Sequence, residues 1–432
     1  MITPVNTHRR VRSRGWIKSA AVLTVAGVLA AACGSDAPPA ADVADAATTV
    51  PASDPVDDSG TVNSAGESDA NDADGNDLPA GEYKFGYAGI ESGAAAFAGI
   101  PTGHGVELAV QQINDSGFLG DGATLVYDAE DTAGDPAKSI NFVNRFIEDD
   151  DVLGIVCCLL SGESGALVPL IQAAGLPAVT TVVLLEGLNN PPYQYRTQLL
   201  PGQPGGAHEQ LVSEMIGVSQ PKTAAIAVTA DSQGQMAELP SWIEPLEANG
   251  VEVVLEVQTL SADVDFTGPA TQIAHEDPDL FINSMYGGTG ALMIKAQRDR
   301  GYTGEIVSNY GISAQDSYDN AGEALDGAVF PVSFYLDSPL PAAQEFAADY
   351  EEKFGESPDS FSVNGYLAAW FFAHRLRLAP DITREGLATG LSQVDAMTET
   401  PIGDITFVDG QAELGEFLFV MWDDGNQELW KS

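Results

Sequence analysis

The stretch GVELAVQQIN, residues 105–114, decides the fold class, because its apolar side chains recur at the spacing of a helix. We predict a helix over 102–116 with one apolar stripe. Four side chains form that stripe: Val106, Ala109, Val110 and Ile113. Strands are predicted before and after it, over 83–89 and 123–128. A strand, a helix and a second strand in this order indicate a βαβ unit of a parallel sheet.

The same alternation continues along the chain in two runs. Asp135 is expected to cap the next helix, with Pro136 at its first position. A proline- and glycine-rich break over 201–206 separates the runs. We therefore expect an α/β protein with two similar lobes, each a parallel sheet flanked by helices. The further strands are predicted over 152–157, 177–181, 223–229, 251–257, 280–284, 305–309, 404–408 and 416–422.

The loops that follow the strands are the expected place for a ligand. In open α/β sheets, ligands bind outside the carboxyl ends of the strands. Five loops are selected by this rule, and they begin at Gly89, Leu160, Thr181, Ala230 and Ser284.

The first 33 residues have the composition of an export signal. A basic leader precedes an apolar stretch over 20–32, which is too short for a bilayer span of about 20 residues. Small residues stand directly before Cys33, as in a bacterial lipobox whose cysteine is acylated. We expect 1–33 to be a lipoprotein signal peptide that ends at the lipidated Cys33, and the lipid to anchor the protein to the outer face of the cell membrane. Plain secretion after an A-x-A cleavage site is the alternative.

The chain is strongly acidic, with 63 Asp and Glu against 18 Lys and Arg and a formal charge of −45. Such a surface repels nucleic acid and anionic lipid, so we expect no nucleic-acid partner and no membrane contact besides the lipid anchor. Adaptation of the protein to salty surroundings is the simplest explanation of the charge, and the charge identifies no ligand. Residues 34–81 contain almost no large apolar side chain and are predicted to be a disordered acidic linker.

Motifs for catalysis and for cofactors fail at their required positions. The segment GESGA over 162–166 has alanine where a nucleophile elbow needs its second glycine. The segment GTG over 288–290 is followed by Met293 where a dinucleotide fingerprint needs its third glycine. The five histidines lie far apart, and no pair has metal-ligand spacing. We expect a protein without enzymatic activity, catalytic residues, cofactor or metal.

Two neighbouring cysteines, Cys157 and Cys158, end an apolar run. Adjacent cysteines form only a strained ring, so we expect two buried thiols in a strand rather than a disulfide.

Several segments resemble the leucine/isoleucine/valine-binding protein family, periplasmic binding proteins of the type I fold. The stretch over 105–114 is the most specific of them, and it matches the first crossover helix of the family. The resemblance covers about 82–425. The other matching segments are YD over 127–128, GDP over 134–136, AGLPAVT over 174–180, DSQG over 231–234, NGVEVV over 249–254 and PIGDITF over 401–407.

The resemblance implies a clamshell in which three crossing strands form a hinge between the lobes. We expect the crossings near 199–201, 330–332 and 398–403, so that 82–200 with 332–400 forms lobe 1 and 201–331 with 401–432 forms lobe 2. A ligand that contacts both lobes stabilises the closed form. The implied function is that of a monomeric substrate-binding lipoprotein that delivers a small molecule to the permease subunits of an ABC transporter. A clamshell sensor that signals to a membrane partner is the alternative.

The resemblance also implies binding residues. Ser161 and Gly162 match the loop that grips a ligand carboxylate through a hydroxyl and backbone N–H groups; a simple helix cap is the alternative for this loop. Val182 matches a position that contributes backbone. Tyr286 matches a tyrosine that closes over the ligand from the second lobe, with a core aromatic as the alternative, and Phe97 is expected to be an apolar wall.

The expected ligand differs from an ordinary branched-chain amino acid. Family members that bind amino acids neutralise the ligand's ammonium group with a carboxylate and a threonine, whose positions match Tyr310 and Leu184 here. Gln233 replaces the usual tyrosine of its loop. These residues favour a small carboxylate or amide with an apolar or aromatic body. Glu91 in the first loop is the alternative source of the missing negative charge, and would keep an amino-acid-like ligand possible.

Overall fold

A computed structural model of the chain describes residues 75–393, 396–414 and 417–430. The predicted signal peptide, Cys33 and the linker up to residue 74 lie outside these residues. The end of the predicted linker is wrong, because Leu78 is buried and its N–H donates to the Leu119 carbonyl at 2.7 Å. Within the described residues, no helix is long and apolar enough to cross a membrane.

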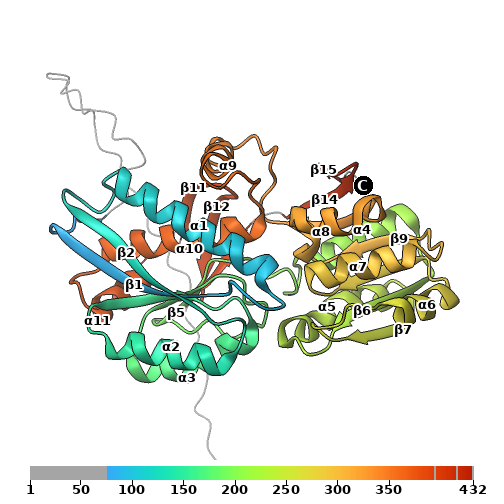
Figure 1. Ribbon diagram of the computed structural model, residues 1–432, viewed down its shortest axis with the longest axis horizontal. Helices are drawn as coiled ribbons and strands as arrows, with labels where there is room; N and C mark the ends of the chain where they lie inside the picture. Colours follow the sequence, from blue (N-terminus) through green and yellow to red (C-terminus); the bar gives the residue numbers. More distant parts are fainter. Residues whose placement is uncertain (1–74, 394–395, 415–416, 431–432) are drawn as a thin grey trace, which may run out of the picture. The chain divides into compact units, whose positions relative to one another are not determined.

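The first sheet has eight strands in the order β11-β12-β13-β5-β4-β3-β1-β2. Figure 1 labels β1, β2, β5, β11 and β12 of this sheet. The six strands from β13 to β2 run parallel, and β11, β12 and β13 form an antiparallel ribbon at one edge. The strands span β1 (Gly81–Gly89), β2 (Ala123–Asp131), β3 (Val152–Cys157), β4 (Ala178–Thr180), β5 (Gln194–Arg196), β11 (Ala396–Thr400), β12 (Gly403–Val408) and β13 (Gln411–Glu413).

Helices cover both faces of this sheet. On one face α1 packs against α10, with α9 and α11 beside them, and their apolar side chains share one core with the sheet. On the other face α2 packs against α3 over a second core. The helices span α1 (Ala96–Asp115), α2 (Pro136–Glu148), α3 (Ser161–Ala174), α9 (Pro341–Phe354), α10 (Ser360–Leu378) and α11 (Arg384–Leu391).

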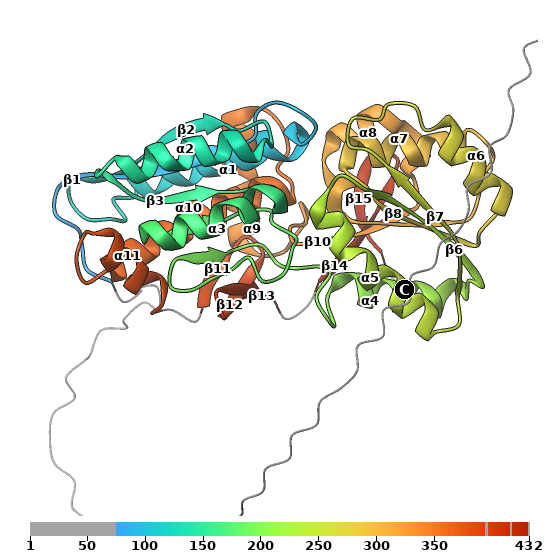
Figure 2. The same cartoon turned by 90° about the horizontal axis from the view of Figure 1, so that it is seen from below.

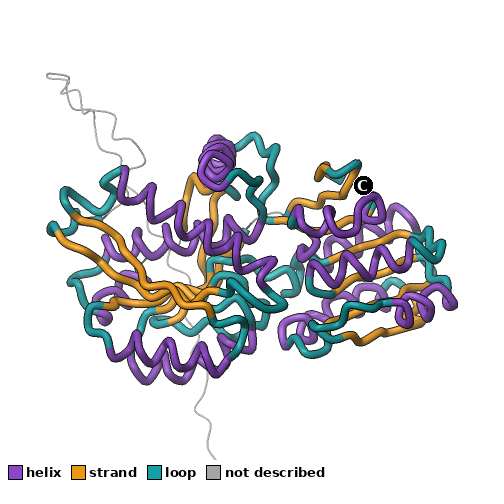
Figure 3. Tube along the Cα trace, in the orientation of Figure 1, coloured by secondary structure: helices purple, strands orange, loops and turns teal. Residues whose placement is uncertain are grey.

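The second sheet has seven strands in the order β15-β14-β10-β9-β8-β6-β7. Figure 2 shows α4 and α5 on one side of its strands and α7 and α8 on the other, and a separate apolar core lies under each layer. The strands, drawn in orange in Figure 3, span β6 (Thr223–Thr229), β7 (Glu252–Thr259), β8 (Leu280–Ser284), β9 (Glu305–Ser308), β10 (Ala328–Val332), β14 (Leu418–Asp423) and β15 (Asn426–Leu429). The helical segments span α4 (Ala207–Ser219), α5 (Gln233–Ala248), α6 (Thr267–Glu276), α7 (Gly287–Arg298), η1 (Tyr310–Ser313), α8 (Gln315–Ala321) and η2 (Gly322–Leu325).

Local sequence explains where key helices begin and how they pack. The predicted cap of α2 is confirmed, because the Asp135 carboxylate accepts the Ala137 N–H at 2.8 Å. Helices α1 and α10 cross closely where Gly105 faces Ser362 and Gly365 faces Thr102. A Cβ at either glycine would collide with the opposing backbone carbonyl. The helix predicted from the first stripe is therefore fixed against a segment about 250 positions later.

The two-lobed α/β architecture is confirmed, but the predicted division of the chain is wrong near its end. Strands β12 and β13 belong to the first sheet, whereas 401–432 was expected to lie wholly in lobe 2. The Thr400–Gly403 turn sends β12 back along β11, and β13 then pairs with β5, where the Arg196 N–H donates to the Gly410 carbonyl at 2.8 Å. The third crossing therefore lies between β13 and β14, not at 398–403.

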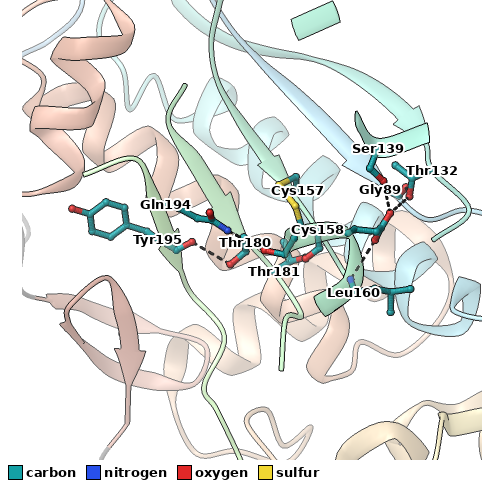
Figure 4. Close-up of a disulfide and its surroundings, with 12 residues drawn as sticks. Gly89, Thr132, Ser139, Cys157, Cys158, Leu160, Thr180, Thr181, Gln194 and Tyr195 are labelled. Atoms are coloured by element: carbon teal, nitrogen blue, oxygen red, sulfur yellow. Dashed lines mark hydrogen bonds between the residues drawn. A yellow bond between two sulfur atoms is a disulfide. The ribbon is translucent and has the colours of Figure 1, made fainter. Parts of the chain in front are cut away.

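The cysteine pair differs from its prediction. Both cysteines are buried as expected, but the structure joins Cys157 to Cys158 in a disulfide (Figure 4). Successive side chains of a strand point to opposite faces, so the two sulfur atoms meet only because the chain leaves the strand here. Cys158 has a positive φ of 67° directly after β3. The disulfide thus lies where β3 gives way to the loop that begins α3.

Candidate functional site

A cavity lies at the carboxyl ends of the strands and is lined by both lobes. All five loops selected by the strand-end rule contribute to it, together with the loop after β9. The first lobe supplies Ala95, Phe97, Ala98, Leu159, Leu160, Ser161, Val182, Leu184 and Phe361. The second lobe supplies Ser232, Gly234, Gln235, Tyr286, Asn309, Tyr310 and Gly311.

Ser161 is placed in the cavity as a hydrogen-bond donor. Its Oγ accepts the N–H groups of Leu184 at 3.2 Å and Leu185 at 3.1 Å. A hydroxyl has two acceptor lone pairs and one proton, so only the proton remains for a further partner. Ser161 begins α3, but its hydroxyl holds the neighbouring loop rather than capping its own helix. The side chain and the helix N-terminus together suit a carboxylate or carbonyl oxygen.

Glu163 holds the start of α3 in place through three hydrogen bonds. Its Oε1 accepts the hydroxyls of Thr132 at 2.5 Å and Ser139 at 2.7 Å, and its Oε2 accepts the Leu160 N–H at 3.3 Å. The three donors of these hydrogen bonds, Thr132, Ser139 and Leu160, are labelled in Figure 4. Burial raises the pKa of Glu163, against the effect of these hydrogen bonds. The sequence predicted a carboxylate-binding loop at Ser161 and Gly162 but gave no role to Glu163, which anchors the start of α3.

Aromatic rings form the walls of the cavity. The centroids of Phe97 and Tyr286 lie 6.1 Å apart, so the two lobes meet through these rings. Phe361 contacts both Phe97, at 5.6 Å and nearly perpendicular, and Tyr310, at 5.3 Å. The Tyr310 hydroxyl accepts the Gln198 Nε2–H at 2.7 Å, and burial raises the pKa of this tyrosine. The predicted aromatic residues Phe97, Tyr286 and Tyr310 therefore lie together.

Three predicted residues do not line the cavity. Glu91 is exposed in the loop after β1, where its backbone N–H donates to Asp131 Oδ1 at 2.9 Å. Gly162 lies one residue beyond Ser161, and a Cβ added there would lie 3.9 Å from the Gln233 side chain. Gln233 and Gly162 thus face each other from opposite lobes, outside the cavity lining. Of the predicted residues, Ser161, Val182, Tyr286, Tyr310 and Phe97 are brought together.

Other lining residues were not predicted from the sequence. Phe361 reaches the cavity from the start of α10, and its position in the chain gives no sign of this. Asn309 ties two loops together, because its Oδ1 accepts the Gly311 N–H and its Nδ2 donates to the Met285 carbonyl, both at 3.0 Å. An asparagine at the end of a predicted strand was the one available signal. Ser232 and Gln235, at the start of α5, add the polar groups of the second lobe.

The charge of the lining is its most informative property. Among the described residues that line the cavity, none has an Asp, Glu, Lys, Arg or His side chain. Its polar groups are hydroxyls and amides, and the remainder is aliphatic or aromatic. A ligand with an ammonium group would lose water there without gaining an anionic partner, at a cost of several kcal/mol.

Comparison with known proteins identifies the family. The sequence profile of the Periplasmic binding protein family matches residues 82–426, which is most of the chain. This chain belongs to the periplasmic binding protein family. The resemblance to leucine/isoleucine/valine-binding proteins is confirmed, and the members of this family bind solutes rather than catalyse reactions.

Curated relatives of this periplasmic binding protein include "Leu/Ile/Val-binding protein homolog 7" of Brucella abortus. The two sequences are 24% identical over 357 residues, which covers 77% of this chain and 87% of the relative. Homolog 8 of the same species is 22% identical over 360 residues, which covers 80% of this chain and 89% of the relative.

Solved structures share the fold. The branched-chain amino acid transporter substrate-binding protein LivJ of Streptococcus pneumoniae, in complex with isoleucine, superposes with a TM-score of 0.73 at 19% identity. The match covers 81% of this chain and 98% of LivJ. A solute-binding protein of R. palustris in complex with benzoate gives 0.72 at 20% identity, over 81% of this chain and 95% of that protein. The type I periplasmic binding protein fold is thus confirmed.

Proposed function

We propose that this protein is the substrate-binding lipoprotein of an ABC transporter, and that it captures a small carboxylate or amide with an apolar or aromatic body. The observation that carries the proposal is the cavity between the lobes, whose lining is aromatic and uncharged. The Ser161 proton and the start of α3 bind the ligand's oxygen atoms, and the rings of Phe97, Tyr286 and Tyr310 enclose its body. Closure of the lobes over the ligand presents it to the permease subunits.

The solved neighbours include one protein with an amino-acid ligand and one with an aromatic carboxylate ligand. Neighbours with the same fold bind isoleucine in one case and benzoate in another. None of the described side chains that line this cavity carries a carboxylate, so none of them can pair with an ammonium group. A benzoate-like ligand, which has no ammonium group, therefore matches the lining better than isoleucine does. Glu91 does not offset this lack, because its exposed loop lies outside the lining.

A thermal-shift screen tests the ligand class. We expect benzoate, 4-hydroxybenzoate or short-chain acids and amides to raise the melting temperature, and leucine, isoleucine and valine to have no effect. A ligand at a hundred times its Kd stabilises a protein by about 2.7 kcal/mol, which such a screen resolves. Stabilisation by the three branched-chain amino acids alone would show that the ammonium group is accommodated, and would reject the proposed ligand class.

We also propose that lipid on Cys33 tethers the protein to the outer face of the cell membrane. Replacing Cys33 by alanine should release the protein into the medium, because the thiol that carries the lipid is lost. Fractionation with labelled fatty acid measures this. A Cys157→Ala/Cys158→Ala double variant, which lacks the other two cysteines, should remain in the membrane fraction. A Cys33→Ala protein that still carries lipid and sediments with membranes would contradict the anchor.

A further inference from the structure

An arginine outside the cavity lining is connected to the ligand-binding serine by hydrogen bonds. Arg196 is the last residue of β5 and has no exposed surface. Its Nη2 donates to the Leu185 carbonyl at 2.8 Å. The backbone N–H groups of Leu185 and Leu184 both donate to Ser161 Oγ. The guanidinium therefore holds the loop whose peptide groups hold the serine.

The backbone of Arg196 is fixed independently of this loop. Arg196 pairs with Gln411 of β13, and its N–H donates to the Gly410 carbonyl at 2.8 Å. The side chain thus reaches from a rigid strand in the sheet to the 184–185 segment, which lies between two strands without belonging to either. A contact from a fixed strand limits the positions that this segment can adopt.

Stability alone does not explain a buried arginine at this place. Within the described part of the chain, the Nε and Nη1 of Arg196 have no hydrogen-bond partner. Burial lowers the pKa of Arg196 to about 10, against the attraction of Glu186 and Glu238. A buried charge with incomplete pairing destabilises a protein relative to an apolar side chain of similar size. A role in orienting the binding loop accounts for its presence at this cost.

A buried carboxyl group of the second lobe also interacts with Arg196, in addition to the exposed Glu186. Glu238 on α5 is buried, and neither of its carboxylate oxygens has a hydrogen-bond partner among the described residues. It packs on the first crossing segment, since a Cβ added at Gly202 would lie 2.9 Å from its Cγ. Burial raises the pKa of Glu238 well above its ordinary value, and Arg196 opposes that shift. Any test of Arg196 has to control for the charge of Glu238.

We propose that Arg196 is a positioning residue for ligand capture. By binding the Leu185 carbonyl, it fixes the Leu184 and Leu185 N–H groups. Because these two groups occupy the lone pairs of the Ser161 hydroxyl, only the hydroxyl proton is left for the ligand. The consequence for binding rests on the proposed function. It is that an acceptor oxygen of the ligand meets a Ser161 hydroxyl that is already oriented as a donor. A serine without these two N–H contacts can rotate its proton away from the ligand, so preorganisation is lost together with the arginine.

Amide hydrogen exchange tests the proposal without a ligand. The background is Glu238→Gln, which replaces the buried carboxyl group by a neutral amide, and the test protein is Arg196→Met/Glu238→Gln. We expect exchange of the Leu184 and Leu185 amides to accelerate by more than tenfold in the double variant relative to Glu238→Gln. The melting temperatures of the two proteins should agree within a few degrees, because a methionine fills the space of the arginine stem. Arg196→Lys keeps the positive charge, and the exchange rates of the Leu184 and Leu185 amides should then lie between those of Glu238→Gln and the double variant.

A matched control separates positioning from general loosening. Arg298 of the second lobe also holds backbone carbonyls, those of Tyr302 and Gly304, both at 3.0 Å. Arg298→Met should leave the Leu184 and Leu185 amides unchanged. Unaltered exchange at these amides in the Arg196 double variant would overturn the proposal. Faster exchange over the whole chain would overturn it too, since that result indicates a structural role.

A binding measurement completes the test. Whichever of benzoate and isoleucine the unaltered protein binds should bind more than tenfold more weakly to the double variant than to Glu238→Gln. Equal affinities would contradict the positioning role. Failure of the unaltered protein to bind either probe, or any of the acids and amides of the screen, counts against the proposed function alone, because the exchange measurement still decides the role of Arg196.

Discussion

Replacing Ser161 by alanine is expected to weaken ligand binding by more than tenfold. The hydroxyl accepts the Leu184 and Leu185 N–H groups and has only its proton left for the ligand. Alanine removes that donor from an apolar cavity, where a hydrogen bond to a charged carboxylate contributes about 1.5–3 kcal/mol. Isothermal titration with the stabilising compounds of the thermal-shift screen measures the change.

The neighbouring Ser164 provides a matched control. It lies on the same helix, is fully buried, and accepts the Gln194 Nε2–H at 3.0 Å away from the cavity lining. Ser164→Ala should leave the affinity within about twofold, although its folding stability falls slightly. A Ser161→Ala protein with unchanged affinity would show that the ligand's oxygen atoms bind elsewhere.

The second lobe is tested in the same titration by Tyr286→Ala. Its ring meets Phe97 of the first lobe and lines the cavity. Loss of this ring should also cost more than tenfold in affinity, since an enclosing aromatic side chain contributes about 1.5–3 kcal/mol through the surface it buries. Unchanged affinity in both variants would place the binding site outside this cavity.

Replacing Arg384 by methionine is expected to lower the free energy of unfolding by about 3 kcal/mol. Its guanidinium donates to four backbone carbonyls: Phe146 at 2.9 Å, Ile147 at 3.0 Å, Asp149 at 2.7 Å and Val152 at 2.9 Å. These belong to the end of α2 and the start of β3, where a helix leaves carbonyls without partners. The positive charge of Arg384 also interacts favourably with the negative end of the dipole of α2. Urea unfolding measures the loss.

Arg377 is the control for this change. Its Nη2 donates to the Gly75 carbonyl at 3.1 Å and lies 3.4 Å from the exposed Asp77 carboxylate. Arg377→Met should cost clearly less than Arg384→Met, because the Arg377 guanidinium donates to one backbone carbonyl and its carboxylate partner Asp77 is exposed. Equal effects of the two substitutions would mean that the four carbonyls of the Arg384 site find other partners, and would refute its role as a clamp.

The parts of the fold that could be predicted from the sequence are those in which burial leaves a pattern. Strands β3, β6 and β8 were predicted with their observed bounds. A central parallel strand is covered on both faces, so nearly all of its residues are apolar and the strand is visible in the sequence as a continuous apolar run. Strands β5 and β13 have three residues each and contain polar side chains such as Arg196 and Gln411. Their pairing with each other depends on tertiary contacts, so no local pattern revealed it, and the lobe boundary was misplaced with it.

The same distinction holds for the site. The ligand loops followed from the topology rule, and the family resemblance then selected Ser161, Val182 and Tyr286 within them. Phe361 could not be found in this way, because it follows a helix rather than a strand and enters the cavity through the packing of α10 on α1. The disulfide was not expected, because a ring between adjacent cysteines is strained; in the structure Cys158 follows the end of β3 and has a positive φ.

The late return of the chain to its first sheet affects the order in which the protein can be assembled. Helix α10 covers the face formed by strands made some two hundred residues earlier, and β13, which lies between β5 and β12, ends only at Glu413. The second sheet in turn lacks β14 until Asp423. Both sheets therefore gain their last strands only after the helices described above have been made. A chain whose sheets are completed this late stays incompletely folded until these strands are in place.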